Sequence, residues 1–173
     1  MNAEQSLVSG TAIVVGVVGN QPDEVLLQAA NFASHFNAEL VFATVDMTRY
    51  TVAEAPDGSV SAFPIDPDAA ELTHEEFDPE LASRVKDILD GIDVKWSLRA
   101  LAGDPAHELS RLAERLDAAL IVVGTRHEGF SGGLREFFTG SVAVHLAHRQ
   151  HRPVVVIPLS PLPHGSHLPW GHS

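Results

Sequence analysis

Glycines and a serine frame the segment 124–141, which lies between an apolar run and a helical pattern. Gly124 ends the apolar run, Gly129 lies inside the segment, and Gly140 and Ser141 come at the start of the helical pattern. The first N–H groups of a helix have no partner within the helix, and the helix dipole places partial positive charge beside them. These residues therefore suit the binding of an anion such as phosphate, because glycine lets a ligand approach the backbone closely.

Two arginines in the same segment, Arg126 and Arg135, supply positive charge that an anionic ligand would meet. Ser141 adds a hydroxyl donor at the expected helix start. The same glycines would also allow a tight connection between a strand and a helix with no ligand at all. A glycine-rich loop is a weak signal by itself, so the spacing leaves both interpretations open.

Other polar residues favour structural roles. His145, His148 and His151 lie close together and three imidazoles can bind zinc, but they also come at the end of a helical pattern, where positive charge suits the dipole. Asp104, followed by Pro105, is typical of a helix N-cap rather than of a catalytic acid. We therefore expect no metal site. No nucleophile and base stand out as a pair, so we also expect no catalytic residues and no enzyme activity.

The composition bounds the class of protein. The chain has 173 residues, 45% of them hydrophobic, and no cysteine, which fits one globular domain without disulfides or thiol chemistry. Its first residues do not form a basic and apolar leader, and no apolar stretch approaches the roughly 20 residues of a membrane span. We therefore expect a cytoplasmic protein that does not enter a membrane.

The charge is negative and unevenly distributed. A net charge of −12 disfavours binding to nucleic acid or to anionic membranes, whose surfaces are also negative. Residues 46–90 carry twelve acidic and three basic side chains, whereas 94–152 carry eight basic and six acidic ones. An anionic ligand is thus better placed in the C-terminal half, and we interpret the acidic stretch as a solvated loop and helix face.

Apolar runs and helical periodicity alternate along the chain. Nearly continuous β-branched runs indicate strands buried on both faces, whereas apolar residues three and four apart indicate helices. Strands are expected at 12–18, 40–45, 94–101, 119–123 and 153–157. Helices are expected from a cap at Asn20 to Phe36, over 81–89, from Asp104 to Leu116 and over 141–149.

This alternation predicts an α/β fold: an open five-stranded parallel sheet with helices on both faces, whose ligands bind beyond the carboxyl ends of the strands. The last strand is expected at an edge of the sheet. Residues 1–158 form the predicted domain. Within it, 47–72 is rich in prolines and acids and is expected to be a long surface loop that acts as a lid or stays mobile. Residues 159–173 are expected to be a flexible Pro- and His-rich tail that does not pack.

Several short motifs occur in the same order as in a known family. They are the segments 122–126, 134–142 and 151–158, supported by 103–106 and by Val45-Asp46. The series resembles the universal stress protein family, whose signature is a Gly, two residues, a second Gly, nine residues, and then Gly-Ser or Gly-Thr. The resemblance extends over residues 11–158. It implies a Rossmann-like fold of the adenine-nucleotide alpha-hydrolase-like type and a homodimer formed through the last strand, 153–157.

The resemblance also implies a ligand, because one branch of this family binds ATP. In that branch the glycine-rich loop holds the phosphates and ribose, and backbone near the second strand holds the adenine. The implied ligand here is ATP or a related adenine nucleotide, with or without Mg²⁺, in a stress-response signalling module. The candidate nucleotide-binding residues are Gly16, Val18, Thr44, Val123, Gly124, Arg126, His127, Gly129, Gly140, Ser141 and Val142.

Two positions depart from the family pattern. The second signature glycine falls on His127, in a loop three residues longer than the pattern, with Gly129 nearby. An aspartate that the family often places after the first strand falls on Val18, which cannot accept a hydrogen bond from a nucleotide hydroxyl. The alternative is a family member that binds no nucleotide and acts through dimerisation and partner contacts. An adenylyl-transferring enzyme is disfavoured, because 18–22 contains neither a Ser-Gly-Gly loop nor a His-x-Gly-His element.

Overall fold

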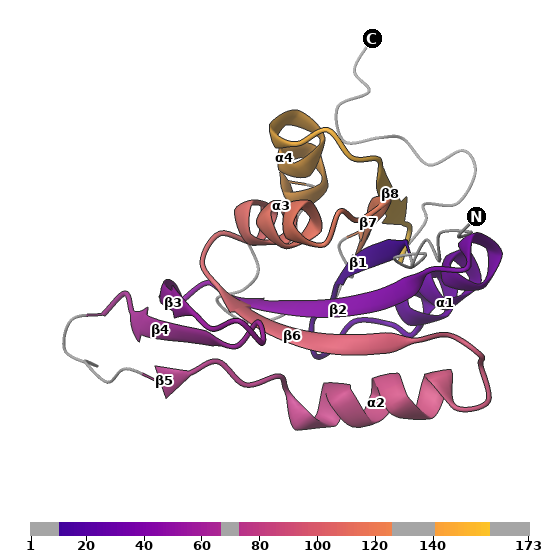
Figure 1. The fold of residues 1–173 in the computed structure, drawn as a ribbon, viewed down its shortest axis with the longest axis horizontal. Coiled ribbons are helices and arrows are strands. Elements are labelled where there is room, and N and C mark those ends of the chain that lie inside the picture. Colours follow the sequence, from indigo (N-terminus) through magenta and orange to yellow (C-terminus); the bar gives the residue numbers. More distant parts are fainter. Residues whose placement is uncertain (1–10, 67–72, 126–140, 160–173) are drawn as a thin grey trace, which may run out of the picture.

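The computed structural model of the chain describes residues 11–66, 73–125 and 141–159. Its main sheet has five parallel strands in the order β6-β2-β1-β7-β8 (Figure 1). These strands are β1 (Ala12–Gly16), β2 (Glu39–Asp46), β6 (Trp96–Ala102), β7 (Leu120–Gly124) and β8 (Val154–Ile157). The predicted five-stranded parallel sheet is confirmed, and β8 lies at an edge of it as expected.

β1 occupies the centre of the sheet, and all of its residues are buried. Val14 pairs with Val41 of β2 on one side and with Ile121 of β7 on the other. A parallel strand that is covered by helices on both faces meets no water, so both of its faces must be apolar. The continuous β-branched sequence of β1 is the consequence.

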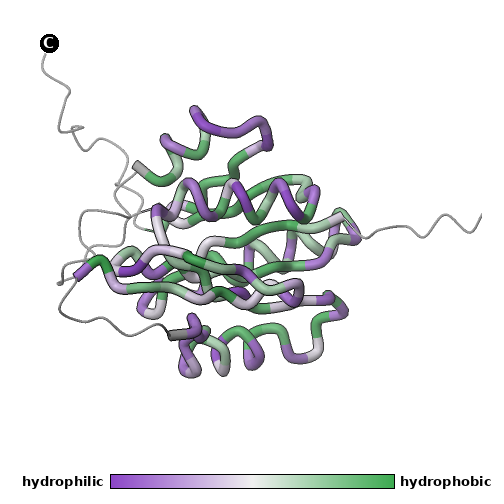
Figure 2. The backbone as a smooth tube through the Cα atoms, turned by 60° about the vertical axis from the view of Figure 1, so that its left-hand side comes forward, coloured by the Kyte–Doolittle hydropathy of each residue, from purple (hydrophilic) through white to green (hydrophobic). Residues whose placement is uncertain are grey.

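Four helices cover the two faces of this sheet within the described residues. α1 (Glu24–Phe36) and α2 (Pro79–Leu89) pack on one face, and α3 (Pro105–Arg115) and α4 (Ser141–Arg149) pack on the other. In Figure 1, α3 and α4 lie on the opposite side of the strands from α2. Figure 2 shows hydrophobic stretches along the central strands and an alternation of hydrophilic and hydrophobic turns along the helices, as expected of helices that bury one stripe.

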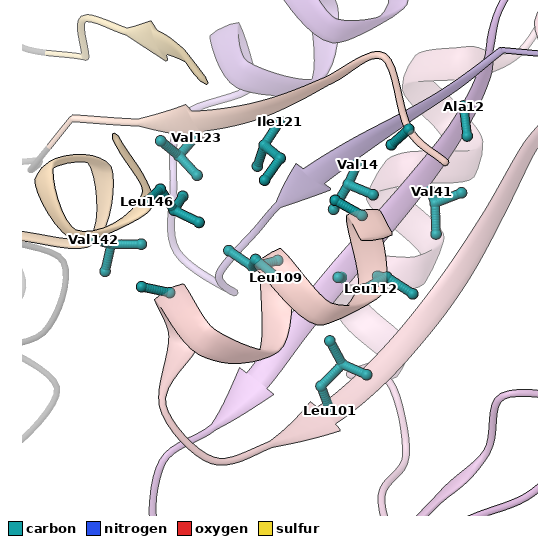
Figure 3. Packing of buried hydrophobic residues seen from close by; sticks show 14 of the residues in the cluster. Ala12, Val14, Val41, Leu101, Leu109, Leu112, Ile121, Val123, Val142 and Leu146 are labelled. Carbon is teal, nitrogen blue, oxygen red and sulfur yellow. The ribbon is translucent and has the colours of Figure 1, made fainter. Parts of the chain in front are cut away.

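The core on the α3 side is formed by aliphatic residues that the helices bring onto the sheet. Leu109 and Leu112 of α3 and Leu146 of α4 are at most 3% exposed and belong to one cluster with Val14 and Ile121 (Figure 3). Burying each such side chain contributes about 1.5–3 kcal/mol. This cluster fixes α3 and α4 over the strands that carry the candidate site.

The helix caps agree with the sequence in one case and differ in another. The predicted cap at Asp104 is confirmed, because its Oδ1 accepts a hydrogen bond from the N–H of His107 at 2.8 Å. The predicted cap at Asn20 is wrong, since α1 begins at Glu24 with Asp23 at the N-cap position. The carboxylate of Asp23 makes no capping bond and instead accepts a hydrogen bond from Arg84 of α2 at 2.5 Å.

The segment after β2 forms a second sheet. Its three antiparallel strands are β3 (Arg49–Glu54), β4 (Val60–Pro64) and β5 (Thr73–His74). The prediction of a surface loop over 47–72 is therefore wrong for most of that range, and 67–72 lies outside the described residues. β3 and β4 form a hairpin whose turn contains Gly58 at φ +85°, a conformation that glycine adopts at no steric cost.

This hairpin is attached to the main sheet through one of its faces. Val60 and Ala62 are buried in the same cluster as α3, at 1% and 0% exposed. The Thr51 hydroxyl donates a hydrogen bond to the carbonyl oxygen of Ala102, at the end of β6, at 2.8 Å. Glu54 forms ion pairs with Arg111 and Arg115 of α3. The hairpin is therefore held against the main sheet and α3.

Leu159, which was expected to belong to an unpacked tail, is packed. Leu159 packs against the cluster that α1 forms with the sheet, and its N–H donates a hydrogen bond to Thr125 Oγ1 at 2.7 Å. Residues 160–173 lie outside the described residues. Among the helices that the structure describes, none combines the length and apolar character needed to cross a bilayer.

Candidate functional site

The candidate site lies where β2, β1 and β7 end side by side. In the register, Gly16 of β1 is level with Ala43 of β2, and Val15 is level with Val122 of β7. The chain proceeds from β1 to β2 and β6 on one side, and then returns to β7 and β8 on the other side. This reversal beside β1 is the topological switch point at which open parallel sheets bind ligands, beyond the carboxyl ends of their strands.

Gly16 is explained by packing. A Cβ at this position would lie 2.9 Å from Leu109 Cδ1 and 3.2 Å from Val123 Cγ1. Both neighbours belong to the core under α3, so a larger residue would push α3 away from the sheet. Gly16 thus positions the site by letting α3 pack closely.

Gly124 also has neighbours where a side chain would be. A Cβ there would lie 2.8 Å from Leu159 Cδ1 and 3.0 Å from Val25 Cγ2. The expectation was that this glycine leaves space for a ligand, whereas the structure fills the space with two aliphatic side chains. Thr125 then joins the ends of β7 and β8, because its N–H donates to the carbonyl oxygen of Ile157 at 2.7 Å.

Two predicted site residues, Val123 and Val142, turn their side chains into the core. They are 3% and 7% exposed and belong to one cluster, and Figure 3 shows them close to Leu146. Only their backbone groups can meet a ligand. This shared core packs the first turn of α4 on the face of the sheet that α3 covers, and α4 begins at Ser141 as predicted.

Part of the predicted site falls outside the described residues. These positions are Arg126, His127, Gly129, Arg135 and Gly140. Thr44 is described and lies near the end of β2, half-buried and level with Ala100 of β6. It lies one residue beyond Ala43, which is level with Gly16 at the end of β1.

Gln21 is a residue that the sequence analysis missed. Its side chain is 5% exposed, and its Oε1 accepts a hydrogen bond from the N–H of Val18 at 3.3 Å. Its own N–H donates to the carbonyl oxygen of Val18 at 3.2 Å, which closes a turn directly after β1. Its Nε2 is buried and has no hydrogen-bond partner within the described part of the chain. A buried donor without a partner is costly, and such groups occur at ligand sites.

Arg84 of α2 is the second residue that the sequence analysis missed. It donates hydrogen bonds to the carbonyl oxygens of Gly19 at 2.6 Å and Gln21 at 2.7 Å, and it contacts Asp23. This arginine therefore holds the loop between β1 and α1 in one conformation. No local pattern could reveal it, because Arg84 lies far along the chain from the loop that it holds.

The histidine group offers no support for a metal centre. His145 and His148 are exposed on α4, and His151 is exposed after it. Within 11–66, 73–125 and 141–159, no three histidine, cysteine, aspartate or glutamate residues gather closely enough to hold a metal ion.

Two carboxylates are neighbours near the end of β2: Asp46, its last residue, and Glu75, which directly follows the second sheet. Asp46 Oδ1 accepts hydrogen bonds from the N–H and hydroxyl of Thr48 at 2.8 and 2.7 Å. Glu75, which follows β5, is partly buried, and its Oε1 lies 3.0 Å from Arg49 Nε. Burial and the negative charge of Asp46 raise the pKa of Glu75 above its ordinary value, although Arg49 opposes this rise. The second sheet thus brings a titratable group close to the end of β2.

Comparisons with known proteins agree on one protein family. The sequence model of the Universal stress protein family matches residues 11–158. The universal stress protein MJ0531 of Methanocaldococcus jannaschii is 32% identical over 146 residues, which cover 82% of this chain and 79% of that protein.

Solved structures agree with this fold. A universal stress protein in complex with cAMP matches with a TM-score of 0.55 and 21% identity, covering 87% of this chain and 98% of that chain. The universal stress protein of Archaeoglobus fulgidus in complex with dAMP matches with a TM-score of 0.51 and 17% identity, covering 85% and 97%. Both are similar to this chain in the arrangement of the sheet and helices.

Proposed function

Because this chain belongs to the universal stress protein family, we propose that it binds ATP or a related adenine nucleotide and acts as a cytoplasmic stress-response signalling module. The observation that carries the proposal is that the ends of β1, β2 and β7 lie side by side at the switch point of the sheet, with the first turn of α4 packed through Val142 into the core on one face of these strands. Two structural relatives were solved with cAMP and with dAMP, which are both adenine nucleotides.

The roles of the residues follow from their positions. The first N–H groups of α4, from Ser141 and Val142, hold phosphate, because a helix start attracts anions. Backbone at Thr44 holds the adenine. The remaining candidate positions supply the loop between β7 and α4 and the backbone along the strand ends; they are Gly16, Val18, Val123, Gly124, Arg126, His127, Gly129 and Gly140. The nucleotide binds either free or as its Mg²⁺ complex, and the protein holds it without rapid catalysis.

The side chain of Val18 offers a nucleotide no hydrogen-bond acceptor, but Gln21, three residues later, offers a hydrogen-bond donor. Its Nε2 is a buried donor without a partner in the described structure, and nucleotides present many acceptor atoms. We assign Gln21 the role of donating a hydrogen bond to the nucleotide beside the end of β1. Gln21→Glu keeps the size of the side chain and replaces the donor with an acceptor, so it should weaken ATP binding.

Calorimetric titration of ATP tests the proposal. Gly140→Val should abolish binding by placing a branched side chain at the helix start, and Ser141→Ala should weaken it by about 1.5–3 kcal/mol. Ser34→Ala is the matched control, because Ser34 is an exposed residue of α1 whose hydroxyl donates to the carbonyl oxygen of Ala30 in the same helix. Thermal unfolding with and without ATP supplies a second readout, because a ligand stabilises only the form that binds it. Absence of both heat and stabilisation at millimolar ATP would rule out the nucleotide.

The second candidate function is a family member that binds no nucleotide and acts as a homodimer through β8 (153–157). Val18 favours this alternative, as does the edge position of β8, where Val156 is 41% exposed. An exposed strand edge invites pairing with another chain. Sedimentation should then show a dimer at micromolar concentration. The carbonyl oxygens of Pro153 and Ile157 face β7, so the backbone of Val156 faces the open edge, and Val156→Pro should weaken the dimer by removing a donor from that edge. A monomer at that concentration would contradict the dimer.

A further inference from the structure

The loop between β1 and α1, residues 17–23, leaves the main sheet at the switch point. The N–H of Val17 still donates to the carbonyl oxygen of Ala43 in β2 at 2.9 Å, so the loop leaves the sheet only after this residue. The following residues therefore start at the carboxyl ends of β1 and β2, where open parallel sheets bind ligands. Among them is Gln21, whose buried Nε2 has no hydrogen-bond partner within the described part of the chain. The conformation of this loop thus decides where a donor beside the site is held.

The hydrogen bonds inside this loop are long. Gln21 donates its N–H to the carbonyl oxygen of Val18 at 3.2 Å, and the N–H of Val18 donates to Gln21 Oε1 at 3.3 Å. N–H···O bonds in proteins are usually about 2.7–3.2 Å long, so both bonds are at or beyond the weak end of that range. Asp23 stands at the N-cap position of α1, but its side chain accepts no capping bond from that helix. The loop therefore depends on support from outside itself.

Arg84 of α2 supplies that support through short bonds. Its guanidinium donates to the carbonyl oxygens of Gly19 and Gln21 at 2.6 and 2.7 Å and to the carboxylate of Asp23 at 2.5 Å. A guanidinium carries its donors in a rigid planar fork, so a single side chain can bridge several acceptors in one geometry. Gly19 also lies against the N-cap residue of α2, because a Cβ there would be 3.3 Å from Asp78 Oδ2. The loop is thus held in place by α2.

We propose that Arg84 is a positioning residue of the nucleotide site, which raises the affinity for nucleotide by holding the Gln21 amide where the ligand meets it. This inference rests on the proposed function. Arg84 acts through the loop and not by touching the nucleotide, since its guanidinium donors already bond the loop. The apparent affinity of a site is proportional to the fraction of molecules that hold the binding conformation. Arg84 keeps that fraction high.

Calorimetric titration of ATP against the full chain tests this role. Arg84→Met should weaken binding about tenfold, as expected if the loop then holds its binding conformation in about a tenth of the molecules. Arg84→Lys keeps the positive charge without the fork and should also weaken binding. Lys86→Met is the matched control, because it removes an exposed positive charge from the same helix, and it should bind ATP as the wild type does.

A second control separates positioning from loss of stability. Leu89 is the last residue of α2 and is 3% exposed, so Leu89→Ala should lower the melting temperature while the affinity for ATP stays unchanged. Arg84→Met should cost much less affinity in a Gln21→Ala background, because the donor that Arg84 positions is then absent. Thermal unfolding of each variant verifies that it is folded during the titration.

Amide hydrogen exchange supplies a readout that a purely structural role would not move. Coupling between the nucleotide and the loop is reciprocal, so ATP should slow exchange in residues 17–23 and in α2 of the wild type. The slowing should be smaller in Arg84→Met at equal saturation with ATP.

Three results would overturn this role while the proposed function stands. They are wild-type affinity in Arg84→Met, an equal loss of affinity in Leu89→Ala, and an equal loss from Arg84→Met with and without the Gln21 side chain. If the wild type bound no ATP, the proposed function would fail and this role would fail with it.

Discussion

The five-stranded sheet and the three-stranded sheet meet at the ends of β2 and β6, and different interactions hold them. The central strands of the large sheet are buried on both faces by helices, and its core is aliphatic throughout. The small sheet is buried on one face only, through Val60 and Ala62, and is attached by hydrogen bonds and ion pairs. We therefore expect the large sheet to open only when the whole domain unfolds, whereas the small sheet can open locally.

The largest expected effect comes from the core of the large sheet. Leu109→Ala should lower the free energy of unfolding by about 2–5 kcal/mol, because it opens a cavity under α3 that the surroundings cannot close. Leu109 is 1% exposed, whereas Leu27 on α1 is 50% exposed. Leu27→Ala is therefore the control and should change the free energy by less than about 0.5 kcal/mol. Urea unfolding measures both, and similar losses would contradict the assignment of this core.

A smaller effect is expected at the junction of the two sheets. Thr51→Val removes the hydrogen bond to the carbonyl oxygen of Ala102 and should cost about 1 kcal/mol. The loss should be local, so amide hydrogen exchange should become faster in β3 and β4 and stay unchanged in β1. Thr51→Ser keeps the hydroxyl and is the control. Faster exchange throughout β1 would show that both sheets unfold as one unit.

The smallest expected effect is a pH dependence in the small sheet. Burial and Asp46 raise the pKa of Glu75 above its ordinary value of 4.5, so the folded state favours the protonated form. The stabilising contribution is complete below that ordinary value and is lost as the pH rises through the folded value. Glu75→Gln imitates the protonated form, so its stability relative to wild type should increase from pH 4 to pH 7.

Thermal unfolding of both proteins across this pH range measures the difference. Glu76→Gln, at an exposed neighbouring position, should show no such slope. A slope of the opposite sign for Glu75→Gln would mean that the ion pair with Arg49 outweighs burial.

The same contrast explains how much of the fold could be predicted. The unbroken apolar run at 12–16 predicts a buried parallel strand, because burial on both faces of a sheet requires apolar residues at every position. β3 carries Tyr50 and Val52 among polar residues, and β4 is short and lies among prolines, so neither gives such a run. Short strands attached through one face are specified mainly by distant contacts, in this case with β6 and α3.

The elements around the candidate site were predictable from the sequence, but the packing of its residues was not. The start of α4 and the end of β7 followed from glycine spacing and from the resemblance. The role of Gly16 depends on Leu109, and that of Gly124 depends on Leu159, and both neighbours come from segments distant in the sequence. Gln21 and Arg84 act through the folded geometry of the β1–α1 loop, which no local pattern of residues encodes.

The place of β1 between β2 and β7 also bears on how the chain folds as it is synthesised. β2 follows β1 closely, but Leu120, the partner of Ile13 on the other side, emerges much later. Until then, one apolar edge of β1 has no strand beside it. Such a nascent sheet can pair with other chains. Translation of 120–124 therefore completes the sheet around β1, and truncation before that point should yield an aggregating fragment.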